Sequence, residues 1–275
     1  MGSIPITRSN FYINLLNAAQ RINKYLIRSN PCMNVLQDWI YVAGYRSGHI
    51  LGRHWRLIRW SRMRAYRVSL LAQVLRTISK DVALAFRERL SEKGEKTKAG
   101  KYFDLASHFA RAISEADHLG VITSKPGLRV MDLGTGCGYF PYVCRYLGHE
   151  ITTIDKQEGK YGYAREQLGV PAHLWEMTPE KPLPDLGQQF DLITAFQPVF
   201  FLYRPEGFGT PWNEDMWEKF FQRLKPALAD GGRFYLGAND TSRADKRTYE
   251  EMLKYFEKKK SDRVSDGWLF SKEHL

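Results

Sequence analysis

Three glycines and two acidic residues form the most chemically informative cluster in this chain. In the segment VMDLGTGCGYF the glycines recur at every second position, one residue tighter than in the GxGxxG turn that binds dinucleotides: Gly134, Gly136 and Gly138. Such a turn needs glycine because the backbone bends sharply and a ligand approaches it closely. Asp132 lies two positions before the first glycine, and Asp155 ends the next apolar segment, ITTID. The spacing predicts a ligand site between two strand ends.

The two carboxylates indicate which kind of ligand the turn would hold. A carboxylate at Asp132 repels a pyrophosphate, whereas it favours a cationic ligand with a free ammonium group, such as the sulfonium compound S-adenosylmethionine. Asp155 closes the following strand, where a ribose diol would lie. The structural alternative is that Asp132 caps a turn and the glycines only tighten the packing.

The cluster belongs to a region of alternating strands and helices that begins near residue 101. Strands are predicted at 128–133, 150–154, 172–175, 190–196 and 233–237, and helices at 102–119, 139–147, 161–168, 213–229 and 243–258. Repeated βαβ order predicts an α/β fold, a Rossmann-like, doubly wound and mostly parallel sheet. In such a sheet the ligand lies at the carboxyl ends of the strands.

The first hundred residues differ in charge from the rest of the chain. Residues 1–100 contain 18 Lys and Arg against 5 Asp and Glu, a net charge of +13, whereas the remainder contains 23 against 25. Helices are predicted at 11–28 and 33–44, and over 54–90 as one long or two abutting helices. The polar stretch SEKGEKTKAG that follows is typical of a linker. We therefore predict a basic helical module, 1–100, followed by a Rossmann-like domain, 101–275.

The segment GRHWRLIRWSRMRAYR (52–67) carries six arginines with two tryptophans and one tyrosine. Interleaved arginines and aromatic rings suit a nucleic acid, a peripheral contact with an anionic membrane surface, or an anionic small-molecule or glycan acceptor. The structural alternative is a solvated helix whose arginines pair with acidic residues elsewhere in the chain. Spacing alone leaves these four interpretations open.

Several segments together resemble the class I S-adenosylmethionine-dependent methyltransferases, over roughly half the chain. They are KYFDL, MDLGTGCGYF, TTIDK, FDLITAF and LADGGRFYLGAND. The resemblance implies an enzyme with S-adenosylmethionine as its cofactor, whose methionine part packs on the glycines above Asp132 and whose ribose is held by Asp155. The same resemblance implies further cofactor-binding residues: Thr135, Lys156, Trp175, Glu176, Met177 and Tyr102. The C-terminal hairpin of the family is expected to be abbreviated.

The methyl acceptor is expected beyond the apolar strand 190–196, in the aromatic and glycine-rich segment 197–212. Enzymes that methylate the amino groups of nucleic-acid bases typically carry Asp/Asn-Pro-Pro-Tyr/Phe here, whereas this chain has QPVF. We therefore predict transfer to O or N of a small or glycan-like metabolite. The alternatives are a nucleic-acid methyltransferase that uses the basic module, and a non-catalytic binding protein. His173, Tyr203 and Glu206 are unranked candidates for a general base.

The remaining composition excludes several other classes. Three cysteines do not form a disulfide framework, and neither clustered Cys and His ligands nor an HExxH motif indicates a metal site. No apolar run reaches the ~18–20 residues that a membrane-spanning helix needs, and the N-terminus lacks a secretory apolar core. A cytoplasmic protein is expected.

Overall fold

Strands and helices alternate through the second half of the chain in the computed structural model, which describes residues 65–91, 100–156, 159–196, 201–204, 207–237 and 246–275. The chain divides into two compact units, Met1–Ser114 and Glu115–Leu275. The boundary near residue 100 between a basic module and a Rossmann-like domain stays a prediction.

The described part of the first unit is helical. Helices α4 (Ala65–Thr77) and α5 (Lys80–Ser91) follow closely on one another. Ser79 caps the start of the second helix, since its hydroxyl oxygen accepts the Val82 amide at 3.2 Å. The 3₁₀ turn η2 (Gly100–Phe103) precedes α6 (Leu105–His118). The predicted helices 11–28 and 33–44, and all but the last three residues of the Arg-rich segment, lie outside the described residues.

Seven strands form one mixed sheet in the second unit, in the order β3-β2-β1-β4-β7-β9-β8. Their bounds are β1 (Arg129–Leu133), β2 (Glu150–Asp155), β3 (His173–Leu174), β4 (Phe190–Phe196), β7 (Leu228–Gly237), β8 (Asp262–Val264) and β9 (Gly267–Ser271). In this order the strands from β3 to β7 pair in parallel, and β9 is antiparallel to both of its neighbours, β7 and β8. The predicted Rossmann-like, mostly parallel sheet is confirmed, and the C-terminal hairpin is short but present.

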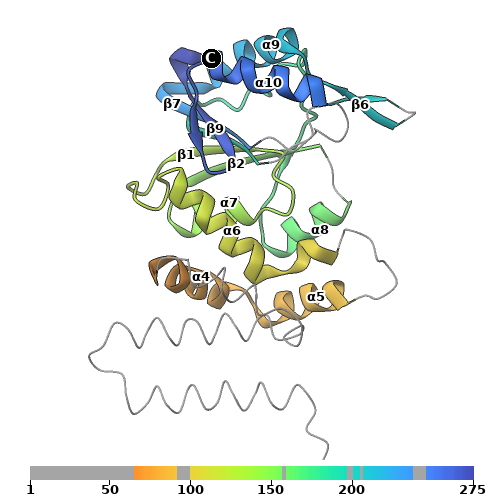
Figure 1. Ribbon diagram of the computed structural model, residues 1–275. Coiled ribbons are helices and arrows are strands. Elements are labelled where there is room, and N and C mark those ends of the chain that lie inside the picture. The colour runs from red at the N-terminus through yellow and green to blue at the C-terminus, as the bar shows by residue number, and fades with distance from the viewer. Residues whose placement is uncertain (1–64, 92–99, 157–158, 197–200, 205–206, 238–245) are drawn as a thin grey trace, which may run out of the picture. The chain divides into compact units, whose positions relative to one another are not determined.

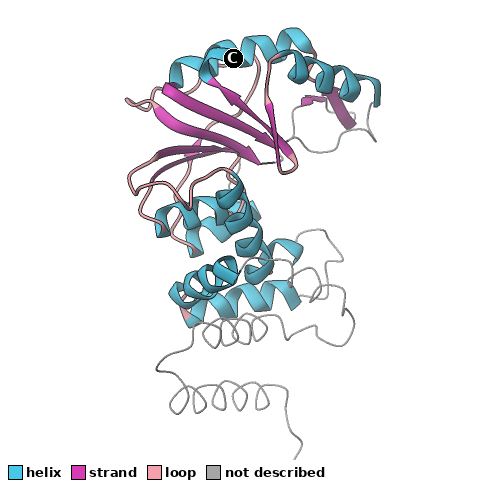
Figure 2. Ribbon diagram, turned by 60° about the vertical axis from the view of Figure 1, so that its left-hand side comes forward, coloured by secondary structure: helices cyan, strands magenta, loops and turns pink. Residues whose placement is uncertain are grey.

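Helices cover both faces of this sheet. In Figures 1 and 2, α9 (Glu214–Leu224) and α10 (Lys246–Lys258) lie on one face, and α7 (Tyr139–Tyr146) and α8 (Gly159–Gln167) lie on the other. Aromatic rings fill the first interface, where Trp217 of α9 contacts Phe256 of α10 with centroids 5.0 Å apart. On the opposite face, the ring of Phe140 in α7 contacts the ring of Phe196 in β4, with centroids 4.6 Å apart. None of the described helices combines the length and apolarity needed to span a membrane.

Two elements differ from their sequence-based prediction. The helix predicted to reach residue 229 ends at Leu224, because Pro226 cannot continue it, and a 3₁₀ turn leads into β7. The segment 197–212, for which no strand was predicted, contains the antiparallel pair β5 (Phe201–Arg204) and β6 (Gly207–Pro211). The aromatic residues at the start of β5 favour a strand, a signal that the glycine content obscured.

A bulge sets the register between β4 and β7. Phe190 pairs with Leu228, yet Leu192 pairs with Arg233, so the extra residues of β7 are accommodated next to Gly232. A Cβ atom at Gly232 would lie 2.8 Å from the Ala229 carbonyl oxygen and 2.9 Å from the Phe190 carbonyl oxygen. Both neighbours are backbone atoms, so neither can move away by changing rotamer.

We expect Gly232→Ala to lower the free energy of unfolding by about 3 kcal/mol, at the upper end of typical overpacking costs, because the backbone itself must shift. Urea denaturation of the purified chain measures this loss. Gly231→Ala is the matched control: its Cβ meets nothing within 4 Å, and only its positive φ of 72° adds strain, worth about 1–2 kcal/mol. Equal denaturation midpoints for the two variants would contradict this account.

Candidate functional site

The glycine turn connects the end of β1 to the start of α7. All three glycines have positive φ, 69° at Gly134, 57° at Gly136 and 81° at Gly138, a region that residues with a Cβ rarely adopt. The amides of Gly134 and Thr135 both donate to the carbonyl oxygen of Ile154, at 2.8 and 3.1 Å. The turn is therefore fixed to the end of β2.

The second and third glycines of the turn have different surroundings. A Cβ atom at Gly136 would meet only the Gly134 carbonyl oxygen, at 3.9 Å, so this position faces open space. A Cβ atom at Gly138 would lie 3.1 Å from the Val170 side chain and 3.3 Å from Cγ of Arg165. Gly136 thus leaves room for a ligand, whereas Gly138 leaves room for the protein's own side chains.

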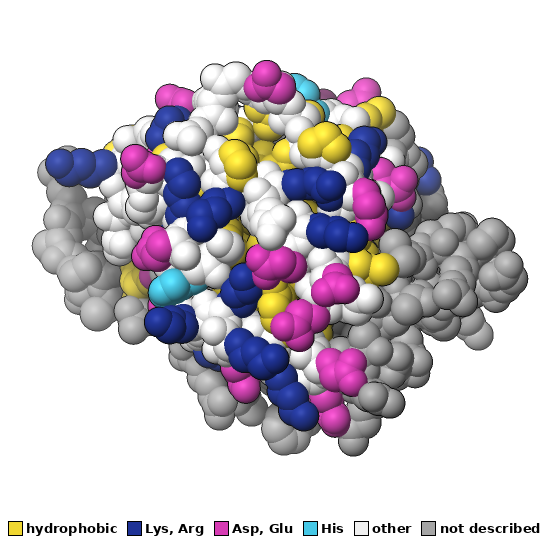
Figure 3. Space-filling model, turned by 90° about the horizontal axis from the view of Figure 1, so that it is seen from above, with side chains coloured by type: hydrophobic (Ala, Val, Ile, Leu, Met, Phe, Trp, Pro, Cys, Tyr) yellow, Lys and Arg dark blue, Asp and Glu magenta, His cyan; other side chains and the backbone are white. Residues whose placement is uncertain are grey.

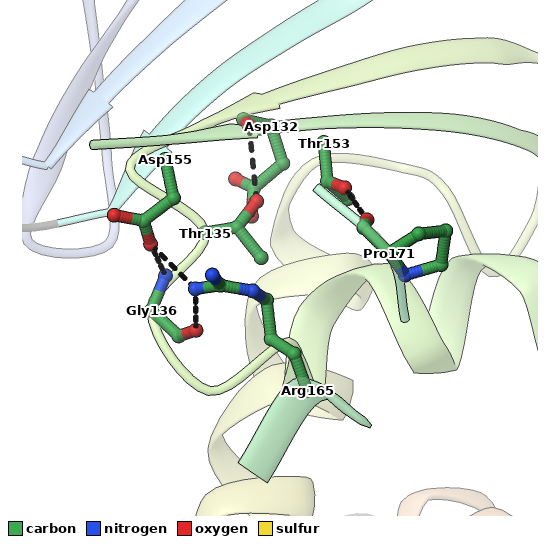
Figure 4. Close-up of polar contacts among 7 residues, drawn as sticks. All are labelled: Asp132, Thr135, Gly136, Thr153, Asp155, Arg165 and Pro171. Atoms are coloured by element: carbon green, nitrogen blue, oxygen red, sulfur yellow. Dashed lines mark hydrogen bonds and ion pairs between the residues drawn. The ribbon is translucent and has the colours of Figure 1, made fainter. Parts of the chain in front are cut away.

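Asp155 ends β2 beside this turn and is largely buried. Its Oδ2 accepts hydrogen bonds from the Gly136 amide at 2.7 Å and from the Arg165 guanidinium at 2.9 Å (Figure 4). The same Arg165 nitrogen donates to the Gly136 carbonyl oxygen at 2.8 Å. The arginine was not identified from the sequence. One signal was available, since it lies beside Ala164 and near Leu168 in a helix that must pack against the sheet.

Asp132, near the end of β1, has no cationic partner among its described contacts. Thr194 donates its hydroxyl to Oδ1 at 2.7 Å, and the Thr135 hydroxyl lies 3.0 Å from both Oδ2 and the Asp132 carbonyl oxygen. Burial raises the pKa of Asp132 to about 7, although the two threonine hydroxyls oppose the rise. A protonated carboxyl fits this arrangement, because Oδ2 can donate to Thr135 while Thr135 donates to the backbone.

The residues after β3 continue the same edge of the sheet. The Trp175 amide donates to the Asp155 carbonyl oxygen at 2.9 Å, and its indole N–H donates to the Pro182 carbonyl oxygen at 3.1 Å. Thr153 donates its hydroxyl to the Pro171 carbonyl oxygen just before β3 (Figure 4). The Trp175 ring lies in the core of the unit, and its predicted contact with the cofactor stays a prediction.

Three other predicted cofactor residues lie close to this edge. Lys156 and Glu176 are exposed and form an ion pair at 3.8 Å between Nζ and Oε1. Met177 is half-buried against the core. His173, a candidate base, is exposed on β3 and is in register with Ile154 of β2.

The remaining predicted residues are described only in part. Tyr102 belongs to the first unit, where its ring stacks on His108 with centroids 6.0 Å apart. Tyr203 lies in β5, and Glu206 and the QPVF segment fall outside the described residues. Their predicted roles stay predictions.

No family model matches this chain. Among curated proteins, the malonyl-[acyl-carrier protein] O-methyltransferase of Serratia marcescens is 30% identical over 120 residues, which are 40% of this chain and 46% of that protein. The chain therefore spans about half the length of this relative. The match confirms the predicted resemblance to S-adenosylmethionine-dependent methyltransferases.

Solved structures of methyltransferases are similar at lower identity. An S-adenosylmethionine-bound amino pentose methyltransferase of calicheamicin biosynthesis from Micromonospora echinaspora is 21% identical, with a TM-score of 0.37, over 58% of this chain and 57% of that one. A TehB-like methyltransferase from Corynebacterium glutamicum is 16% identical, with a TM-score of 0.37, over 64% and 81%. The chain's own sheet order agrees with the curated sequence match. This chain has a Rossmann-like methyltransferase fold.

Within the methyltransferase fold, the glycine turn, Asp132 and Asp155 come together at the carboxyl ends of β1 and β2, where the sequence placed them. Among the residues described here, no group of three or more His, Cys, Asp or Glu side chains is arranged to hold a metal ion. Cys137 of the turn and Cys144 of α7 are both buried and not disulfide-bonded.

The raised pKa of Asp132 predicts how stability depends on pH. The unfolded carboxyl ionises near pH ~4, whereas the folded one keeps its proton up to about pH 7. The folded state therefore binds more protons in this interval, and stability falls as pH rises through it. We expect the wild type to lose about 2–3 kcal/mol more than Asp132→Asn between pH 5 and pH 8, at about 1.4 kcal/mol per unit of pKa shift.

Urea denaturation at four pH values between 5 and 8 measures this difference. Asp266→Asn, which changes an exposed aspartate on the β8–β9 turn, is the control and should follow the wild type. Parallel curves for the wild type and Asp132→Asn would show that Asp132 is ionised in the folded protein at pH 5.

Proposed function

We propose that this chain transfers a methyl group from S-adenosylmethionine to an oxygen or nitrogen of a small or glycan-like acceptor. One observation carries the proposal. The glycine turn leaves open space at Gly136, between the strand-end carboxylates of Asp132 and Asp155. The relation to a curated O-methyltransferase supports it.

The residues around the turn fit this cofactor in both shape and charge. The backbone at Gly136 allows a ligand to approach to contact distance, as the methionine part requires. Asp132 provides negative charge below the amino-acid end when it is ionised, and a bound ammonium group favours that form. Asp155 has acceptor capacity for about four hydrogen bonds, so two donors at Oδ2 do not exhaust its ability to accept from ribose hydroxyls.

When bound, S-adenosylmethionine would supply an electrophilic methyl group on its sulfonium sulfur, and the glycine turn and Asp155 would hold it. The protein's contribution is to align the acceptor and to exclude water. An ionised carboxylate can attack without losing a proton, whereas a neutral hydroxyl benefits from a base. The curated relative is named as an O-methyltransferase of a malonyl group on a carrier protein.

The order of strands favours some base candidates over others. His173 lies on β3, which is separated from β4 by β2 and β1, roughly 14 Å at the usual spacing of strands. Tyr203 lies on β5, and Glu206 is three residues further along, in the segment that follows β4. We therefore favour Tyr203 and Glu206 over His173 if the acceptor is a hydroxyl.

The face of the second unit that carries α9 and α10 has, among its described residues, no large excess of positive side chains that would attract an anionic acceptor (Figure 3). Figure 3 shows the face on which α9 and α10 lie, where Lys and Arg side chains alternate with Asp and Glu. Ion pairs join the two signs there, including Lys259 with Glu218 at 2.7 Å. Residues 101–275 contain 23 Lys and Arg against 25 Asp and Glu, whereas residues 1–100 have a net charge of +13, so the basic residues 1–100 are the stronger source of attraction for an anionic acceptor.

We expect the purified chain to bind S-adenosylhomocysteine, the product form of the cofactor, and Gly136→Val to abolish this binding. A branched side chain would fill the open space that the ligand needs. Isothermal titration calorimetry measures the affinity, and circular dichroism checks that the variant is folded.

Gly187→Val is the matched control for this experiment. Gly187 also has a positive φ, 67°, and open space around its Cβ position, but it precedes β4, at the opposite end of the parallel strands from the turn. The control should keep wild-type affinity despite the same type of backbone strain. Unchanged affinity in a folded Gly136→Val variant would place the cofactor elsewhere.

A second experiment separates a small acceptor from a nucleic acid. We expect no saturable binding of mixed-sequence oligonucleotides at physiological salt, because the motif typical of base methylation is missing after β4. Fluorescence anisotropy measures this. Tight binding whose logarithm falls linearly with that of salt, and which Arg56→Glu with Arg59→Glu eliminates, would instead favour a nucleic-acid substrate.

A further inference from the structure

Arg165 is a charged residue in the last turn of α8 that is almost completely buried. Only 3% of its side chain is exposed, and its ion-pair partner Asp155 has a side chain that is 10% exposed. One guanidinium nitrogen donates both to Asp155 Oδ2 and to the Gly136 carbonyl oxygen. The arginine therefore connects α8, the end of β2 and the middle of the glycine turn at a single atom.

The surroundings hold the arginine in this position. Its Cγ lies 3.3 Å from the place where a Gly138 Cβ would be, so the stem passes directly against the third glycine. Its backbone carbonyl oxygen accepts the Val170 amide at 2.8 Å, and Val170 packs against the same glycine. A side chain with its stem packed and its head paired has few other rotamers available.

The contacts also determine how the Asp155 carboxylate is oriented. The Gly136 amide and the Arg165 guanidinium approach the same oxygen, Oδ2, from the turn and from the helix (Figure 4). Two charge-assisted hydrogen bonds to one oxygen fix the plane of the carboxylate. Because Arg165 also donates to the Gly136 carbonyl oxygen, both the amide and the carbonyl group of Gly136 are hydrogen-bonded within this cluster.

We propose that Arg165 is a positioning residue for ribose binding: it orients the Asp155 carboxylate and the Gly136 peptide so that both meet the cofactor in one arrangement. This inference rests on the proposed function, because Asp155 is assigned to the ribose hydroxyls there. Arg165 acts through Asp155 and the turn, and contributes preorganisation.

Two alternative roles for Arg165 predict different results. If the ion pair competed with the ribose for Asp155, removal of the arginine would release the carboxylate and tighten cofactor binding. If Arg165 were important only for packing, its removal would lower stability, and the affinity of the folded fraction would not change.

The test measures the affinity of the full chain for S-adenosylhomocysteine by calorimetry, well below the melting temperature of each variant. Arg165→Met removes the charge at similar length, and we expect it to weaken binding about tenfold or more, as the loss of a charge-assisted hydrogen bond to the ligand's partner would do. Arg165→Lys keeps the charge and should restore most of the affinity, leaving a loss of about threefold.

Arg145→Met is the matched control for the helix itself. Arg145 caps the same helix, donating to the carbonyl oxygens of Leu168 and Gly169 at 3.0 and 2.6 Å, and has no described contact with Asp155. This variant should bind within about twofold of the wild type. If Arg165→Met does not fold, Arg165→Lys and Arg145→Lys replace the pair, and equal affinities in those two overturn the proposal.

A double-mutant cycle with Asp155→Asn supplies a readout that packing alone would not change. We expect Arg165→Met to cost less than about twofold in the Asp155→Asn background, because the orienting contact is already lost. An equal loss in both backgrounds, or tighter binding by Arg165→Met, would overturn the proposal. Failure of the wild type to bind would overturn the proposed function as well, whereas wild-type binding with no effect of Arg165→Met would overturn this inference alone.

Discussion

The parallel pairing of β1 with β2 is the constraint on which the candidate site depends. Leu133 and Ile154 are partners at the ends of these strands, and the carbonyl oxygen of Ile154 accepts two amides of the glycine turn. The pairing brings the start of the turn and the carboxylate of Asp155 to the same edge of the sheet. Without this register, the second carboxylate would face a different part of the turn, since a shift of one residue reverses the direction of every side chain.

The two carboxylates of the site are stabilised in different ways, and this difference gives them different chemistry. Asp155 is paired with a buried guanidinium and a backbone amide, so its negative charge is compensated inside the protein. Asp132 meets only hydroxyl groups among its described partners, so its burial favours the neutral form. Asp155 can thus accept hydrogen bonds from hydroxyl groups, whereas the protonation state of Asp132 can respond to the charge of a nearby ligand.

Much of the fold could be predicted from the sequence because buried parallel strands are short, apolar runs that turn residues separate. The strand-end acids Asp132 and Asp155 could be recognised since their spacing from the glycines is local. Arg165 and Thr194 were not recognised, because each reaches the site from another element, and the apolar neighbours of Arg165 indicate only that it faces the sheet, not which partners it meets. The end of α9 was predicted too late, although Pro226 was a visible signal.

The close approach at Gly138 has a consequence for how this protein can vary. A Cβ atom at 138 would lie 3.1 Å from two atoms of the Val170 side chain and 3.3 Å from Cγ of Arg165, so these side chains already fill the space beside the glycine. A residue with a side chain at 138 would therefore need smaller side chains at 165 or 170, and it would still have the strained positive φ of 81°. In homologous sequences we expect glycine to be retained at 138 for both reasons, and glycine at 136 to be retained for its φ of 57° and for the space it leaves to a ligand.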